Sequence, residues 1–146
     1  MTRRRATIVV VLGWGLTAFA AEPVVVGHVK TIKGEAYVVT GSQSVKAAVG
    51  TPVNAGSVLK TSAQSSMGVV FKDDTVMSFG PNTTLTVDEY IYAPSKGDYK
   101  LGASLAKGTL DYLSGAIAHI KPDAVSIRTP TGTIGVRGTH FAVKVD

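Results

Sequence analysis

The 146-residue chain contains no cysteine. It therefore has no disulfide, no thiol nucleophile, no thiolate metal ligand and no cysteine that could carry a lipid anchor. Other catalytic signatures are missing too: no serine stands in a GxSxG elbow, no histidines follow HxH or HExxH spacing, and no glycine-rich loop opens a helix. These absences predict a protein that is not an enzyme, with no cofactor and no bound metal.

The remaining titratable residues are few and scattered. Three histidines, His28, His119 and His140, could form a metal site only if the fold brought them together. Two carboxylate pairs, Asp73–Asp74 and Asp88–Glu89, are adjacent in sequence, and adjacent strand residues point to opposite faces. Such pairs are poorly placed to share a proton, so we expect solvated charges at turns and strand ends.

The first twenty residues are typical of a secretory signal peptide. Arg3–Arg5 precede the uncharged apolar run Ala6–Ala20, and Ala18 and Ala20 form a small-x-small cleavage site. An uncleaved membrane anchor is the alternative, but the run is shorter than the ~20 residues that span a bilayer. Export by the twin-arginine route is less expected, because the apolar pair that usually follows the two arginines is missing here. We therefore predict cleavage after Ala20 and a periplasmic or secreted domain, residues 21–146, without a stable membrane span.

The charge of the chain lies largely in this leader. Removing three arginines lowers Lys+Arg from 15 to 12 against 10 Asp+Glu, so the net charge falls from +5 to +2. A balance this close to neutral gives no electrostatic footprint for nucleic acid, and we expect no nucleic-acid partner.

The predicted fold class is all-β, with mostly antiparallel short strands in a sandwich, roll or solenoid-like arrangement. Turn signals recur every eight to twelve residues or so, and no window carries a sustained helical period. Segments 24–29 and 35–40 flank a turn at Lys33–Gly34 and are expected to form a hairpin. Segment 101–113 is the weakest strand prediction, because its Ala, Leu and Lys residues would also tolerate a helix.

Three tyrosines offer a candidate binding surface. Tyr90 and Tyr92 alternate on one face beside the loop 93–98, and Tyr99 follows it. A tyrosine platform next to a loop can bind sugar or peptide. The alternative, which we prefer, is that the rings cover the end of the core.

Most of the chain resembles the FecR domain family. The segments that carry the resemblance are "GSVLKTSAQSSMGVVFKDDTVMSFGPNTTLTVDEY", the link "LAKGTLDYLSGAI" and the ending "SIRTPTGTIGVRGTHFAV", which together reach from Gly56 to Val145. The ending supplies the motif residues Thr129, Pro130, Gly132, Val136, Arg137, Gly138, Thr139 and Phe141.

The resemblance implies a periplasmic or surface-exposed all-β module. The family is best known from membrane regulators of iron uptake that relay occupancy of an outer-membrane receptor to a sigma factor. Only five residues precede the apolar segment here, and the sequence stops at Asp146, so we expect neither an anti-sigma region nor a receptor-binding subdomain.

We expect instead an exported module that binds or supports an envelope protein or glycan. A signalling accessory that senses an outer-membrane receptor, with a separate membrane regulator, is the alternative, and a hydrolase at the 93–99 loop is a remote one.

The "VRGT" sequence inside the last motif predicts a bent corner. Arg137 should lie on the outer face or at the corner, where Gly138 lets the chain bend. We expect the arginine donors to tie the corner together, the alternative being a ligand clamp. If the arginine ties the corner together, Gly138→Val and Arg137→Ala should each cost about 1–3 kcal/mol of stability. An Arg137→Ala protein that melts like the wild type but loses its envelope partner would instead make this arginine the binding site. Alternation predicts that the neighbouring core-facing side chains are Ile134, Val136, Phe141, Val143 and Val145.

Overall fold

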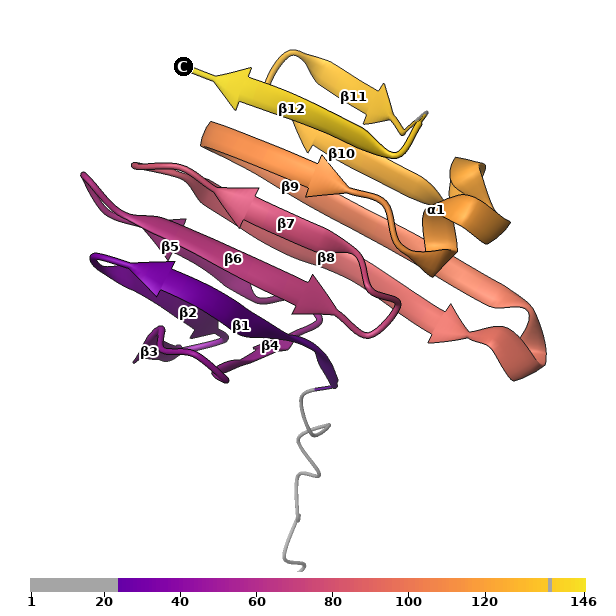
Figure 1. Ribbon diagram of the computed structural model, residues 1–146, viewed down its shortest axis with the longest axis horizontal. Coiled ribbons are helices and arrows are strands. Elements are labelled where there is room, and N and C mark those ends of the chain that lie inside the picture. Colours follow the sequence, from indigo (N-terminus) through magenta and orange to yellow (C-terminus); the bar gives the residue numbers. More distant parts are fainter. Residues whose placement is uncertain (1–23, 137) are drawn as a thin grey trace, which may run out of the picture.

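The computed structural model describes residues 24–136 and 138–146, which fold into twelve strands with one short α-helix and two 3₁₀ turns (Figure 1). The predicted signal peptide and Arg137 lie outside the described residues. The elements are β1 (Val25–Lys33), β2 (Ala36–Thr40), β3 (Gln43–Lys46), β4 (Pro52–Asn54), β5 (Val58–Thr61), β6 (Ser66–Phe71), β7 (Val76–Phe79), β8 (Thr84–Ala93), η1 (Pro94–Lys96), β9 (Asp98–Leu113), α1 (Ala116–Ile120), η2 (Pro122–Ala124), β10 (Val125–Thr129), β11 (Gly132–Gly135) and β12 (His140–Val145).

The strands form a single curled sheet whose two halves face each other, which confirms the all-β prediction. The first layer runs β4-β1-β6-β7-β9-β12, and the second layer runs β3-β2-β5-β8-β9-β10-β11. Among these strand pairs only β9 and β10 are parallel, and the connection between them passes through α1 and η2. Strand β9 belongs to both layers.

Strand β9 is the longest strand, and it passes from one layer to the other near Gly108. Lys107 still pairs with Thr84 of β8 in the second layer, whereas Gly108 pairs with Val145 of β12 in the first. Gly108 has φ +95°, a backbone conformation that residues with a Cβ atom resist. The segment 101–113 is therefore a strand, because partners on both sides outweigh the helix propensity of its Ala and Leu residues.

The hairpin expected around Lys33–Gly34 is wrong, although both of its strands exist. Strand β1 pairs with β4 and β6 in the first layer, and β2 pairs with β3 and β5 in the second. Gly34, at φ +75°, turns the chain from one layer to the other, and the Ser65 hydroxyl accepts a hydrogen bond from Glu35 N at 2.9 Å. A glycine turn between two apolar alternations predicts a turn, but it does not say whether the strands pair side by side or face each other.

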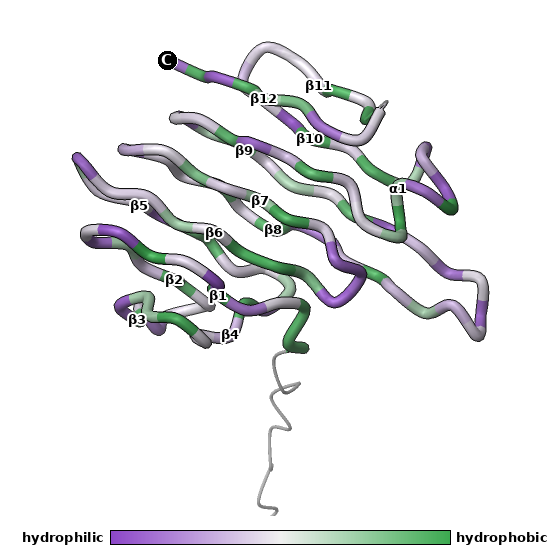
Figure 2. The backbone as a smooth tube through the Cα atoms, viewed as in Figure 1, coloured by the Kyte–Doolittle hydropathy of each residue, from purple (hydrophilic) through white to green (hydrophobic). Residues whose placement is uncertain are grey.

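The hydrophobic core fills the space between the two layers. Figure 2 shows the hydrophobic (green) stretches along β6 and β7, and alternation of side chains places one side of β6, β7 and β8 inward. These inward residues are at most 2% exposed: Met67, Val69, Phe71, Met77, Phe79, Leu85 and Val87. Burial of this kind stabilises by about 25 cal/mol per Å² of apolar surface, and it is the main source of stability in a chain without disulfides.

The short helix α1 covers the end of this core next to β9. Its Ile117 is fully buried, and its Ala118 is nearly so. Within residues 24–136 and 138–146, no helix has the length and apolar character needed to cross a membrane.

Candidate functional site

A β-bulge at Asp88 decides where the tyrosines point. In the pairing of β8 with β9, Val87 lies opposite Ala103 and Glu89 lies opposite Gly102, so Asp88 is the extra residue. One extra residue reverses the alternation, since side chains change face at every position. Val87 and Tyr90 consequently both face the core, and the sequence pattern alone would have placed them on opposite faces.

Tyr90 is partly buried and packs against the core. Its ring stacks on Phe71 with the ring centroids 5.4 Å apart. Its hydroxyl donates a hydrogen bond of 2.6 Å to Asp73 Oδ1 and accepts one of 2.9 Å from Asp73 N. Burial, and then this contact with the carboxylate, raise the pKa of the Tyr90 phenol well above its usual range. The three tyrosines therefore do not form one exposed platform.

Tyr92 and Tyr99 form a separate pair at the end of the β8–β9 hairpin. They are opposite each other in the ladder, and their ring centroids are 6.1 Å apart. Both are half-buried and pack against the core. What they expose is a small aromatic edge beside η1, and the prediction that this edge binds a ligand stays a prediction.

Asp73 is buried, which makes the expected solvated charge at this position wrong. It is 2% exposed, whereas its neighbour Asp74 is exposed. Thr75 Oγ1 donates to Asp73 Oδ2 at 2.7 Å, and Ile117 N donates to the same oxygen at 3.0 Å. With the Tyr90 hydroxyl and with Thr75 N, which lies 3.4 Å from Oδ1, four donors surround the carboxylate, and this number of partners makes its burial tolerable.

The Asp73 cluster links three parts of the fold that are distant in sequence. It joins the β6–β7 turn to β8 through Tyr90 and to the first turn of α1 through Ile117. Ala116 N also donates to the Asp73 carbonyl at 2.8 Å. A Cβ atom on Gly115 would lie 2.3 Å from Thr75 N, so only glycine fits between the turn and the helix. The sequence signal was "DDT", which predicts a turn but not what the aspartate binds.

Tyr90→Phe should destabilise the protein more than Tyr112→Phe does. The first change leaves Asp73 Oδ1 without its closest donor, and loss of such a partner costs about 1–3 kcal/mol. The hydroxyl of Tyr112 is buried without a hydrogen-bond partner in the described part of the chain, so its removal should cost nothing or stabilise slightly. Urea denaturation of both variants measures the difference. Equal losses would contradict the hydrogen-bond network.

The protein should lose stability as the pH rises above about 10. The unfolded chain releases tyrosine protons near that pH. Folded Tyr90 and Tyr112, whose pKa values are raised chiefly by burial, keep theirs. The unfolded state then binds fewer protons than the folded state, so the free energy of unfolding falls with increasing pH. Urea midpoints between pH 9 and pH 11 should fall less steeply in Tyr90→Phe. Parallel profiles would contradict the assignment.

The C-terminal motif forms a hairpin and then the predicted corner. Thr129 and Gly132 pair at the ends of β10 and β11, and Thr129 Oγ1 donates to Gly132 O at 3.0 Å. Gly138 has φ +95°, so the predicted bend at this glycine is confirmed. All the side chains predicted to face the core do so, with Val136 4% exposed and the others partly buried: Ile134, Phe141, Val143 and Val145.

Ser114 ties this corner to the end of β9. Its hydroxyl donates to Gly138 O at 3.0 Å, and its backbone N–H donates to Thr139 O at 2.8 Å. Arg137, which we expected to tie the corner together, lies outside the described residues, so that expectation stays a prediction. Ser114 was not singled out by sequence, because a serine in "LSGA" gives no sign of a contact with a segment more than twenty residues away.

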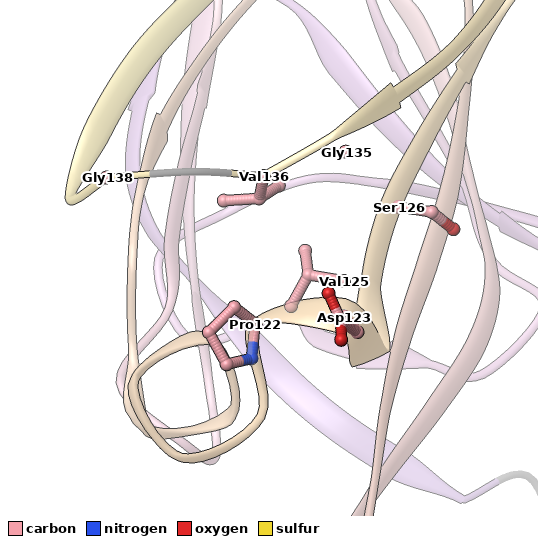
Figure 3. A pocket seen from close by; sticks show the side chains of 7 residues that line it. All are labelled: Pro122, Asp123, Val125, Ser126, Gly135, Val136 and Gly138. Atoms are coloured by element: carbon pink, nitrogen blue, oxygen red, sulfur yellow. The ribbon is translucent and has the colours of Figure 1, made fainter.

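A pocket of about 550 Å³ opens beside the corner (Figure 3). Its apolar side chains come from three segments, with Pro122 in η2, Val125 in β10 and Val136 after β11. Asp123 is exposed and brings a carboxylate to the rim. Ser126, Gly135 and Gly138 complete the lining. A hollow with apolar walls and one carboxylate can hold an apolar group that carries a hydrogen-bond donor.

The pocket and the tyrosine pair lie at the same end of the sandwich. The β8–β9 hairpin, α1 and the β11–β12 corner are all on the right in Figure 1, away from the β1–β2 turn. We call this region the pocket end. The three histidines lie on different elements: His28 on β1, His119 on α1, and His140 on β12 beside Asp111. Within the described ranges no three potential metal ligands come together.

This arrangement is that of an all-β module with an aromatic edge and a pocket at one end. The sequence profile of one family, described as FecR protein, matches residues 57–146. The match covers more than half of the chain, and the chain belongs to the FecR family. It includes β8, β9, the Asp73 cluster and the whole C-terminal motif. Comparison with curated proteins and with solved structures gave no match.

Proposed function

We propose that this protein is an exported, non-enzymatic module of the bacterial cell envelope that binds an envelope protein or glycan through its pocket end. The observation that supports this most is the position of the pocket, which is built partly from the C-terminal motif and lies wholly inside the family match. Its walls are apolar, and among the described residues that line it the charged one is Asp123 at the rim. No cofactor, metal or nucleic acid enters the proposal.

Capture from envelope extracts tests the binding role. Asp123→Arg reverses the charge at the rim without touching the core, because Asp123 is exposed. The matched control is Glu35→Arg, an exposed acid at the opposite end of the sandwich. We expect the wild type and Glu35→Arg to retain the same partner and Asp123→Arg to lose at least about 90% of it. Equal recovery by all three proteins would exclude the pocket end as the binding surface.

Export is the second part of the proposal, and it predicts a mature N-terminus at Ala21. The leader is supported by Arg3–Arg5, the apolar run Ala6–Ala20 and the small residues Ala18 and Ala20. Intact-mass measurement on protein from the envelope fraction should give the mass of residues 21–146. A full-length chain held in the inner membrane would contradict the cleaved, periplasmic or secreted form.

The signalling alternative is supported by membership of the same family. In that role the module would sense an outer-membrane receptor together with a separate membrane regulator. Deletion of the gene would then abolish induction of a receptor gene, whereas a binding or scaffolding role predicts unchanged transcription. A sigma factor and a receptor encoded nearby would favour sensing.

A further inference from the structure

Strand β12 is an edge strand with little protection, since Lys144 is its one lysine. In the described part of the chain it pairs only with β9, so its other edge has free backbone donors and acceptors. The other edge strands are shorter, with four residues in β3, three in β4 and four in β11, against six in β12. Strand β4 also begins with a proline, and β11 begins and ends with glycine. Short strands, proline and glycine discourage pairing between edges, and β12 has none of them.

The inner face of β12 is apolar and only partly covered. Phe141, Val143 and Val145 point toward the core, yet each remains partly exposed. They stand at the open end of the sandwich, where the first layer ends in β12 and the second layer ends in β11. A further strand added to β12 would bury these side chains and extend the first layer. To cover them, the added strand must have an apolar residue at every second position.

We propose that this strand is β12 of a second copy of the chain, paired antiparallel with Val143 opposite its own counterpart. This register is self-complementary on the inner face. It places Phe141 opposite Val145 of the other copy, and an aromatic residue beside a β-branched one is a favourable cross-strand pair. The two first layers would become one continuous sheet, with apolar contacts along the whole junction.

The charges on the outer face select the same register. Centred on Val143, the pairing places His140 opposite Asp146 and Lys144 opposite Ala142. Centred on Lys144, it would place two lysines directly opposite each other. Centred on Ala142, it would place His140 opposite Lys144. Like charges opposite each other destabilise a strand pair, so of these three registers the Val143 register is the one without a direct repulsion.

The cysteine-free chain allows a direct test by disulfide trapping. In the proposed register, Val143→Cys brings two sulfurs opposite each other across the dimer axis, within disulfide reach. Ala142→Cys, one residue away, would place its two copies diagonally, at about 7–8 Å, beyond that reach. Each variant is expressed from the complete gene and purified in the form that the cell produces. The purified protein is then oxidised and run on a non-reducing gel. Val143→Cys should form a covalent dimer and Ala142→Cys should not. A monomer for both, or better trapping through Ala142→Cys, overturns the proposal.

A charge pair at Ala142 separates dimerisation from folding stability. Ala142 is exposed, and within one chain it lies opposite Asp111. Ala142→Lys should therefore stabilise the fold slightly, and Ala142→Glu should destabilise it. Across the dimer, residue 142 of each copy lies opposite Lys144 of the other copy. Ala142→Lys should therefore weaken association about fivefold, and Ala142→Glu should strengthen it. Sedimentation equilibrium across the micromolar range measures this. A wild type that stays monomeric overturns the proposal. So does tighter association of the more stable Ala142→Lys than of Ala142→Glu.

Discussion

Asp73→Ala is expected to lower the free energy of unfolding by about 3–5 kcal/mol, because it leaves several buried donors without an acceptor. Thr75 Oγ1 and Ile117 N lose the shared oxygen Oδ2, and the Tyr90 hydroxyl loses Oδ1. The methyl group of alanine replaces none of these contacts. The loss should appear as a lower urea midpoint, together with faster amide exchange in α1, which the carboxylate holds in place.

The adjacent aspartate provides the control. Asp74 is exposed at φ +67°, a conformation that asparagine also adopts readily. Asp74→Asn should therefore change stability by no more than about 0.5 kcal/mol. The two aspartates are indistinguishable in the sequence "KDDT", so a large difference between the variants would come from burial alone. An Asp73→Ala protein that melts like the wild type would show that the cluster does not hold the fold together.

Gly108→Val is expected to have the largest effect of any glycine substitution we consider, enough to prevent folding. A Cβ atom at position 108 would lie 2.2 Å from Thr83 Oγ1 and 2.4 Å from Thr83 Cα. Thr83 is itself fixed, because its hydroxyl donates to Gly80 O at 2.9 Å and accepts from Thr109 N at 3.1 Å. Relief of this clash requires β9 to move at the point where it changes layers.

Gly138→Val is the matched comparison, because Gly138 has the same φ of +95° but, chain neighbours aside, no atom of the described residues lies within 4 Å of the added Cβ. It should carry only the backbone cost, about 1–3 kcal/mol. Thermal melting of both variants separates strain from steric clash: Gly138→Val should fold with a lower Tm, and Gly108→Val should not give a cooperative transition. Similar melting temperatures would contradict the view of β9 as a tightly packed crossing strand.

The parts of the fold that the sequence predicts are those governed by local rules. Alternation alone identifies the inward residues of β6, β7 and β12, because each strand has one face toward the core. The positive φ angles of Gly34 and Gly138 follow from the turns that surround them. Strand partners do not follow in this way. The sequences on both sides of the turn at Gly34 are those of a hairpin. Only the packing of the two layers shows that β1 and β2 face each other instead of pairing.

Only part of the candidate site could be predicted from the sequence, because Pro122, Asp123 and Val125 of the pocket carry no motif that singles them out. The motif from Thr129 to Phe141 lies where the sequence places it, and its glycine bends as expected. The bulge at Asp88 carries no composition signal, yet it decides that Tyr90 faces inward. Asp73 was expected in water because turn aspartates usually are, and its four donors include one from a segment 44 residues away. Long-range contacts of this kind have no local sequence pattern.

Site-specific photo-cross-linking in living cells tests most directly whether the pocket end binds an envelope component. A photoreactive side chain replaces Asp123 at the pocket rim in one strain and Glu35 at the opposite end in another, both exposed positions. A protein partner gives a discrete larger band, and a glycan partner moves the chain into the sacculus fraction. The account predicts one such adduct from position 123 and none from position 35. No adduct from position 123, or the same adducts from both, would contradict it.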